Sequence, residues 1–220
     1  MKRSEINEIQ RKAKKFLAKH SFNLPPWAFW GPKEWALVGQ EVDEITSCML
    51  GWDITDFGSN DFTKRGLFLF TLRNGNATHY SNKVYAEKIM IVEVDQETPM
   101  HFHRHKMEDI INRGGGVLCI QLYVSTPSEE LSEEPLTVSI DGISVNIKAG
   151  DIVRLQPGMS ICLTPFMYHR FYAEGETCLV GEVSMVNDDT LDNRFYEDVG
   201  RFSEIEEDEE ILHLLSNDYK

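Results

Sequence analysis

The chain has 220 residues, of which 41% are hydrophobic and 26% are charged, and this composition suits one folded domain with a sizeable core. Its formal net charge of −14 argues against nucleic acid and anionic membranes as partners, and no apolar stretch is long enough to cross a membrane. Its four cysteines form no CxxC pair and its charged N-terminus has no apolar run, so we expect a cytoplasmic protein with reduced thiols and no signal peptide.

Residues 1–60 are predicted to form a helical and aromatic extension that packs on the rest of the protein. Apolar residues recur at helical spacing from Ile6 to Leu17, which predicts an amphipathic helix over 4–20 with Ser4 as its cap. The stretch FNLPPWAFWGPKEW follows, and its paired prolines exclude a continuous helix. We expect its aromatic rings to pack the extension onto the body; the alternative is that they line a substrate entrance.

Residues 61–190 carry the pattern of an antiparallel β-barrel. Short apolar or alternating runs are separated by turn residues, and no helical run lies between them. The stretch LTVSIDGISVNI is the clearest hairpin, because its Asp141-Gly142 pair tolerates the positive φ angles of a two-residue turn. A mainly β sandwich or barrel is therefore expected.

Residues 191–220 are predicted to be a C-terminal tail of the same structural domain. The run IEEDEEILHLLSNDYK is strongly acidic and carries several apolar residues after its carboxylates. It predicts a short acidic helix whose apolar residues pack on the barrel.

The stretch HFHRHKMEDIINRGGG brings metal-ligating residue types together. His101 and His103 are one residue apart and so share one face of a strand. With Glu108 and the distant His169 they offer three nitrogens and one oxygen, which leaves open positions on a six-coordinate Mn, Fe, Co or Ni ion. His105 has the same strand parity and is the alternative to His101 in a shifted site.

The same residues resemble a known family. HFHRHKMEDIINRGGG is similar to the first metal motif of the cupins, and GDIVRLQPGMSICLTPFMYH is similar to the second, with a longer interval than is common between Gly150 and His169. WDITDFG, VNDDTLDNRFYEDVGRF and the N-terminal helix extend the likeness, which covers nearly the whole chain and is to the bacterial D-lyxose isomerases.

The resemblance implies a cupin-type antiparallel β-barrel, or jelly roll, that holds Mn²⁺ or Co²⁺ on His101, His103, Glu108 and His169. It also implies a metal-dependent aldose–ketose isomerase that interconverts D-lyxose and D-xylulose, and D-mannose and D-fructose, through a metal-bound cis-enediol. Two alternatives remain at this point: a cupin metal dioxygenase and a non-catalytic sugar-binding cupin.

Isomerisation needs a base to carry the C2 proton, and Glu182 is the first candidate. If Glu174-Gly175 is a tight turn, His169 opposes Val180, and Glu182 then shares the face of His169. Glu182 is either this base or a partner that orients a ligand histidine.

Further candidates surround this position. Lys106 and Glu204 are the other possible acid–base groups, and Lys88, Asp189 and Arg194 are predicted to bind sugar hydroxyls. The alternative is that these residues have no functional role, in which case the lysines lie on the solvated surface and the aspartates cap a turn. We also expect a homodimer, because pairing commonly covers aromatic segments and exposed sheet edges.

Overall fold

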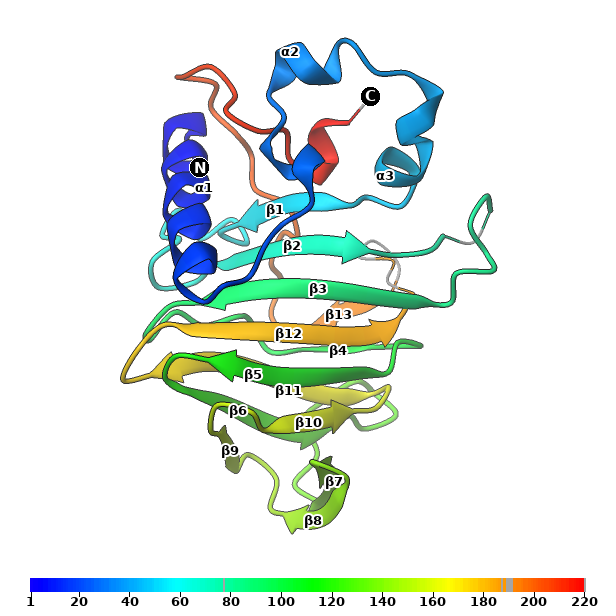
Figure 1. Ribbon diagram of the computed structural model, residues 1–220. Helices are drawn as coiled ribbons and strands as arrows, with labels where there is room; N and C mark the ends of the chain where they lie inside the picture. The colour runs from blue at the N-terminus through cyan, green and yellow to red at the C-terminus, as the bar shows by residue number, and fades with distance from the viewer. Residues whose placement is uncertain (77, 187, 189–191, 220) are drawn as a thin grey trace.

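The computed structural model describes residues 1–76, 78–186, 188 and 192–219, and it contains two antiparallel sheets packed face to face (Figure 1). The larger sheet has the order β1 (Gly51–Thr55), β2 (Leu67–Arg73), β3 (Tyr85–Val92), β12 (Cys178–Met185), β5 (Glu108–Gly114), β10 (Ser160–Leu163), β7 (Leu136–Ile140) and β8 (Ile143–Ile147). The smaller sheet has the order β13 (Asn193–Phe195), β4 (His101–His103), β11 (Met167–Glu174), β6 (Val117–Val124) and β9 (Ile152–Leu155). The predicted mainly β, cupin-type barrel is confirmed.

The inner faces of the two sheets enclose the main core. Along β5 buried and more exposed residues alternate, as the period of two in a strand requires. Ile110 of β5 faces inward and packs in one cluster with residues of both sheets, including Leu118, Leu122, Phe171 and Val180. The barrel interior is therefore largely filled, and the site described below occupies its polar end.

The N-terminal extension forms one long helix, α1, and several short helices at the β1 end of the larger sheet (Figure 1). Helix α1 (Arg3–Lys19) confirms the predicted helix, and it is followed by η1 (Pro26–Phe29), α2 (Pro32–Trp35), η2 (Gln40–Val42) and α3 (Asp43–Ser47). Ile6 and Leu17 of α1 pack with Trp52, Phe68 and Phe70 in a second apolar cluster outside the barrel. None of the helices in the described ranges has the length and apolarity that crossing a membrane requires.

The aromatic stretch packs the extension together, as expected. Trp27 stacks on Phe70 with ring centroids 5.3 Å apart, and Trp35 contacts both Trp30 and Tyr219 at 5.4 and 5.0 Å. These rings are used in packing against the body and the C-terminal tail.

The turn at Glu174-Gly175 joins β11 to β12, but the two strands do not pair with each other. β11 pairs with β4 and β6 in the smaller sheet, whereas β12 pairs with β3 and β5 in the larger one. The predicted hairpin is therefore wrong: His169 lies opposite Leu122, and Val180 pairs within the other sheet. In a jelly roll the chain passes between sheets at such a turn, so a tight turn does not imply a hairpin.

The tail does not form the predicted acidic helix. Among its described residues, the only helical turn is η3 (Ser216–Asp218), and the rest runs beside α1. The Asn7 side chain donates to the backbone oxygen of Glu210 at 2.8 Å and accepts from the backbone nitrogen of Leu212 at 3.0 Å. Because α1 satisfies these backbone groups, the tail gains its hydrogen bonds without becoming helical.

Arg3 is the main polar anchor of this tail. Its side chain is 1% exposed and forms ion pairs with Glu207 at 2.7 Å and Asp218 at 3.2 Å. We expect Arg3→Leu to lower the free energy of unfolding by about 2 kcal/mol, because two carboxylates lose a charged partner. Arg11→Leu is the control, since its pair with Glu209 is exposed and is expected to cost less than about 1 kcal/mol. Urea unfolding measures both; equal effects would contradict the anchor.

The same anchor has a pH dependence of known sign. The hydrogen bond from Arg3 and the positive charge of Arg3 hold the pKa of Glu207 below the ordinary value of 4.5. The stabilisation is therefore present at neutral pH and is lost as the pH falls below 4.5 through the lowered pKa. Wild type and Arg3→Leu should converge in stability over that acidic range.

Candidate active site

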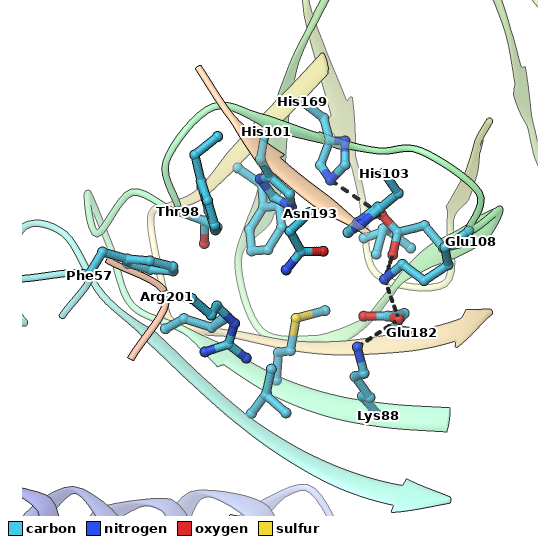
Figure 2. Close-up of a pocket in the computed structure, with 17 residues that line it drawn as sticks. Phe57, Lys88, Thr98, His101, His103, Glu108, His169, Glu182, Asn193 and Arg201 are labelled. Carbon is cyan, nitrogen blue, oxygen red and sulfur yellow. Dashed lines mark hydrogen bonds and ion pairs between the residues drawn. The ribbon is translucent and has the colours of Figure 1, made fainter. Parts of the chain in front are cut away.

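Three histidines converge inside the barrel from two neighbouring strands (Figure 2). His101 and His103 lie on β4, and His169 lies on β11 directly opposite His101. One ligand nitrogen from each lies within 4.8 Å of the others, and all three side chains are buried. Phe102, between the first two, points to the opposite face of β4 and is fully buried there. Strand alternation thus aims both β4 histidines into one site.

Hydrogen bonds from the far side of two rings determine which nitrogen faces the site. His101 Nδ1 lies 2.8 Å from the Pro99 backbone oxygen, and His169 Nδ1 lies 3.0 Å from that of Met167. A carbonyl can only accept, so each Nδ1 carries a proton, and Nε2 is the ring nitrogen that can bind a metal. Burial also lowers the pKa of His101 well below its usual value, which keeps the ring neutral. Neutral, oriented imidazoles are the form that binds a divalent transition metal.

His105 is not part of this cluster. Its side chain is exposed, and its backbone nitrogen donates to Asp192 Oδ1 at 2.7 Å. The other Asp192 oxygen accepts from the backbone nitrogen of Lys106 at 3.1 Å and lies 3.9 Å from His103 Nδ1. Asp192 therefore holds the loop after β4 in place. The alternative in which His105 replaces His101 as a ligand is wrong, because the His105 side chain is exposed and lies outside the cluster.

Glu108 supplies an oxygen beside the imidazoles. Its Oε1 lies 3.3 Å from His103 Nε2 and 3.2 Å from His169 Nε2, while its Oε2 lies 2.6 Å from Lys106 Nζ. Burial opposes ionisation of this carboxyl, but the Lys106 ammonium outweighs it and holds the pKa of Glu108 well below its ordinary value. An ionised carboxylate next to three imidazoles fits the donor set of a divalent metal.

A buried chain of alternating charges continues from Glu108 across the larger sheet. Lys106 Nζ lies 2.9 Å from Glu182 Oε1, and Lys88 Nζ lies 3.2 Å from the same oxygen. Ser184 also donates to Glu182 Oε1, at 2.9 Å. Figure 2 shows the second oxygen of Glu182 directed into the cavity. The four charged side chains balance one another, as buried charges must.

The neighbouring charges keep Glu182 and Lys106 ionised. Burial alone would raise the pKa of Glu182, but Lys106 and Lys88 outweigh it and hold that pKa below its ordinary value. Burial alone would lower the pKa of Lys106, but Glu108 and Glu182 raise it above its usual range. At neutral pH the cavity therefore presents an ionised carboxylate and at least one ammonium group close to the imidazoles.

Glu182 reaches this position by a different route from the one predicted. On β12 it pairs with Lys88 of β3 and with Ile110 of β5, so it faces inward from the larger sheet toward His169 on the smaller one. Lys106 lies in the loop before β5 rather than on the strand.

Three other predicted residues are not placed in the cavity. Arg194 points away from it and donates to Glu129 Oε2 at 2.8 Å, and Glu204 is an exposed residue of the tail. Asp189 lies outside the described residues.

Three polar cavity residues, Thr98, Asn193 and Arg201, were not predicted from the sequence. Asn193 lines the cavity beside Phe195, because strand alternation on β13 turns both inward and turns Arg194 outward. Arg201 lines its far side and forms an ion pair with Asp53 of β1. Strand alternation could have indicated that Asn193 points inward and Arg194 outward. No pattern in the sequence indicates that Arg201 pairs with Asp53, which lies far away along the chain.

Comparison with known proteins gives consistent results over the whole chain. A family model described as D-lyxose isomerase matches residues 1–219. The chain is 47% identical to the D-lyxose/D-mannose isomerase of Escherichia coli O157:H7, over 100% of this chain and 99% of that protein. It is 48% identical to the D-lyxose/D-mannose isomerase of Serratia proteamaculans, over 100% of this chain and 98% of that protein.

Solved structures share the fold at low sequence identity. The L-ribose isomerase of Cellulomonas parahominis with L-ribose superposes with a TM-score of 0.61 at 16% identity, covering 94% of this chain and 98% of that chain. The L-ribose isomerase of Geodermatophilus obscurus gives 0.62 at 16% identity with the same coverage. These likenesses support the cupin-type architecture.

Proposed function

The chain belongs to the D-lyxose isomerase family and is an aldose–ketose isomerase, and from this premise we propose that it interconverts D-lyxose with D-xylulose and D-mannose with D-fructose. The observation that carries the proposal is the buried, ionised Glu182 facing the three-histidine cluster from the opposite sheet. Family membership sets aside the dioxygenase and the non-catalytic sugar-binding alternatives.

We propose Mn²⁺ as the cofactor, with Co²⁺ as a substitute, held by His101, His103, Glu108 and His169. The bound ion would supply Lewis acidity to the sugar carbonyl. The buried Nε2 atoms and the ionised Glu108 support this ligand set.

In the proposed reaction, Glu182 acts as the base. Its free oxygen takes the proton from C2 of the open-chain aldose, the C2 electron pair forms a double bond to C1, and O1 gains the charge of an enediolate. Glu182 then returns the proton to C1, which completes the ketose.

The lysines account for the second proton, which moves between the two sugar oxygens. Lys106, 2.9 Å from Glu182, donates a proton to O1 as its charge develops and recovers one from O2. Lys88 holds a hydroxyl further along the sugar. Glu204 receives no role here, because it is exposed on the tail.

The proposed activity is tested by incubating purified protein with Mn²⁺ and D-lyxose and separating the products. D-xylulose is expected, together with D-fructose from D-mannose. Failure of both aldoses to yield their ketoses would contradict the proposed substrates.

We also propose a homodimer. Tyr85, Val183 and Met185 are each 45–51% exposed on the outer face of β3 and β12, and exposed apolar residues that gather in this way mark association sites. Sedimentation at micromolar concentration should give twice the chain mass of 25.3 kDa, and Val183→Glu should return the protein to the single-chain mass. A wild type that sediments as single chains would contradict this proposal.

We propose that the protein works in the cytoplasm. Cys48, Cys119, Cys162 and Cys178 are free thiols, three of them buried, which suits a reducing compartment.

A further inference from the structure

The cavity beside the metal ligands is too small for a whole sugar. Its volume is about 40 Å³, and a water molecule needs roughly 10–15 Å³ by the same measure, so it holds about three to four waters. An open-chain pentose has ten carbon and oxygen atoms. A substrate whose first two carbons lie at the histidines must therefore extend into a neighbouring space.

One direction out of the cavity is apolar. Leu67, Leu69, Met90 and Phe171 line it toward the barrel core. Sugar hydroxyls placed there would lose their hydrogen bonds to water without replacement, which is costly. This direction is closed to a polyol on chemical grounds.

A second direction is polar and leads past Lys88. A second cavity, of about 320 Å³, lies there, and Lys88 lines both cavities. Asp53, Thr71 and Asn74 are among its walls, and each is at least 90% buried. The ion pair between Arg201 of the first cavity and Asp53 of the second marks the boundary between them.

Strand register aligns these groups in one row. Thr71 of β2 pairs with Lys88 of β3, and Lys88 pairs with Glu182 of β12, so the three side chains face inward side by side. Two interstrand spacings separate the ends of this row by roughly 10 Å. An extended six-carbon chain, with bonds of about 1.5 Å, spans roughly 6 Å between its terminal carbons. The row is long enough to accommodate a sugar from C2 at Glu182 to its distal end near Thr71.

Thr71 has a hydroxyl available for a ligand. It makes no side-chain hydrogen bond to another residue in the described part of the chain, although the residue is only 5% exposed and lines the second cavity. A hydroxyl that lines a cavity can both donate a hydrogen bond to a sugar hydroxyl placed there and accept one from it.

We propose that the second cavity is the subsite for the distal hydroxyls of the open-chain aldose, and that Thr71 sets the chain length the enzyme accepts. This inference rests on the proposed function. In it, Lys88 binds the middle of the chain, and the C5 and C6 hydroxyls of a hexose lie beyond Lys88, against Thr71.

The test compares two substitutions at Thr71. Thr71→Leu adds bulk to the second cavity and should lower the ratio of kcat/KM for D-mannose to that for D-lyxose by at least about tenfold. Thr71→Val keeps the shape without the hydroxyl and should raise the KM for D-mannose about two- to tenfold. Thr137→Leu, at an exposed position of β7, is the matched control and should leave the ratio unchanged. Metal content should be unaltered in all three.

Polyol binding separates this inference from the proposed function. Calorimetry with the five-carbon D-arabinitol and the six-carbon D-mannitol measures binding without turnover. Thr71→Leu should weaken the binding of D-mannitol more than that of D-arabinitol. Equal weakening of both polyols, or unchanged binding of both, would overturn the subsite whether or not the wild type isomerises an aldose. If Thr71→Leu does not fold, Thr71→Val decides: an unchanged affinity for D-mannitol overturns the proposal.

Discussion

Replacing Glu182 with glutamine is expected to lower kcat on D-lyxose by about 10²- to 10⁴-fold, because the amide cannot accept the C2 proton. The substitution keeps the shape of a side chain that is 4% exposed and contacts Lys106 and Lys88, so the bound metal should be retained. Single-turnover kinetics and metal analysis of the same sample measure the two quantities. Glu87→Gln, on the outward face of β3, is the control and should leave kcat unchanged.

Loss of the metal together with activity would show instead that Glu182 orients the ligands. A label from solvent tests the chemistry independently. In heavy water the wild type should place deuterium at C1, because a carboxyl that holds the proton between steps exchanges it with solvent. Complete retention of the original hydrogen in a single turnover would contradict the enediol and favour a hydride shift.

Removing one histidine is expected to abolish both metal binding and turnover. His103→Ala takes away a buried Nε2 donor and leaves Glu108 with one imidazole contact fewer, so activity should not be recovered at ordinary Mn²⁺ concentrations. Chelation of the wild type should have the same effect, reversed by Mn²⁺. His105→Ala is the matched control, because that side chain is exposed. Full turnover by rigorously metal-free protein would contradict the mechanism.

Local periodicity was enough to predict that two of the clustered histidines share a site. His101 and His103 share a face because strand side chains alternate, and this holds whatever the strand pairs with. Glu182 was also predicted near the cluster, but through a hairpin that does not exist. It faces the histidines because β12 lies in the opposite sheet, and only the global topology determines that.

Other features depend on competition between distant segments. The acidic tail has a helical pattern, yet α1 offers its backbone better partners, such as Asn7, from about two hundred positions away. The ion pair of Arg201 with Asp53 is equally non-local. Residue spacing carries no information on such contacts, so the boundary between the two cavities could not be predicted.

The contact between α1 and the tail sets an order for folding on the ribosome. Helix α1 is synthesised well before the tail, but the buried guanidinium of Arg3 finds its carboxylates only at Glu207 and Asp218. Until those residues are synthesised, α1 can lie on β1 to β3 only with Arg3 and its other polar groups hydrated. The contact between α1 and the tail closes the longest loop of the chain, so we expect it to form last. Hydrogen exchange should therefore show the backbone amides of α1 opening together with the tail, at a lower free energy than those of β5 and β12. The polar end of the barrel, including the row of Glu182 and Lys88, can then be complete before the N-terminal helix is locked.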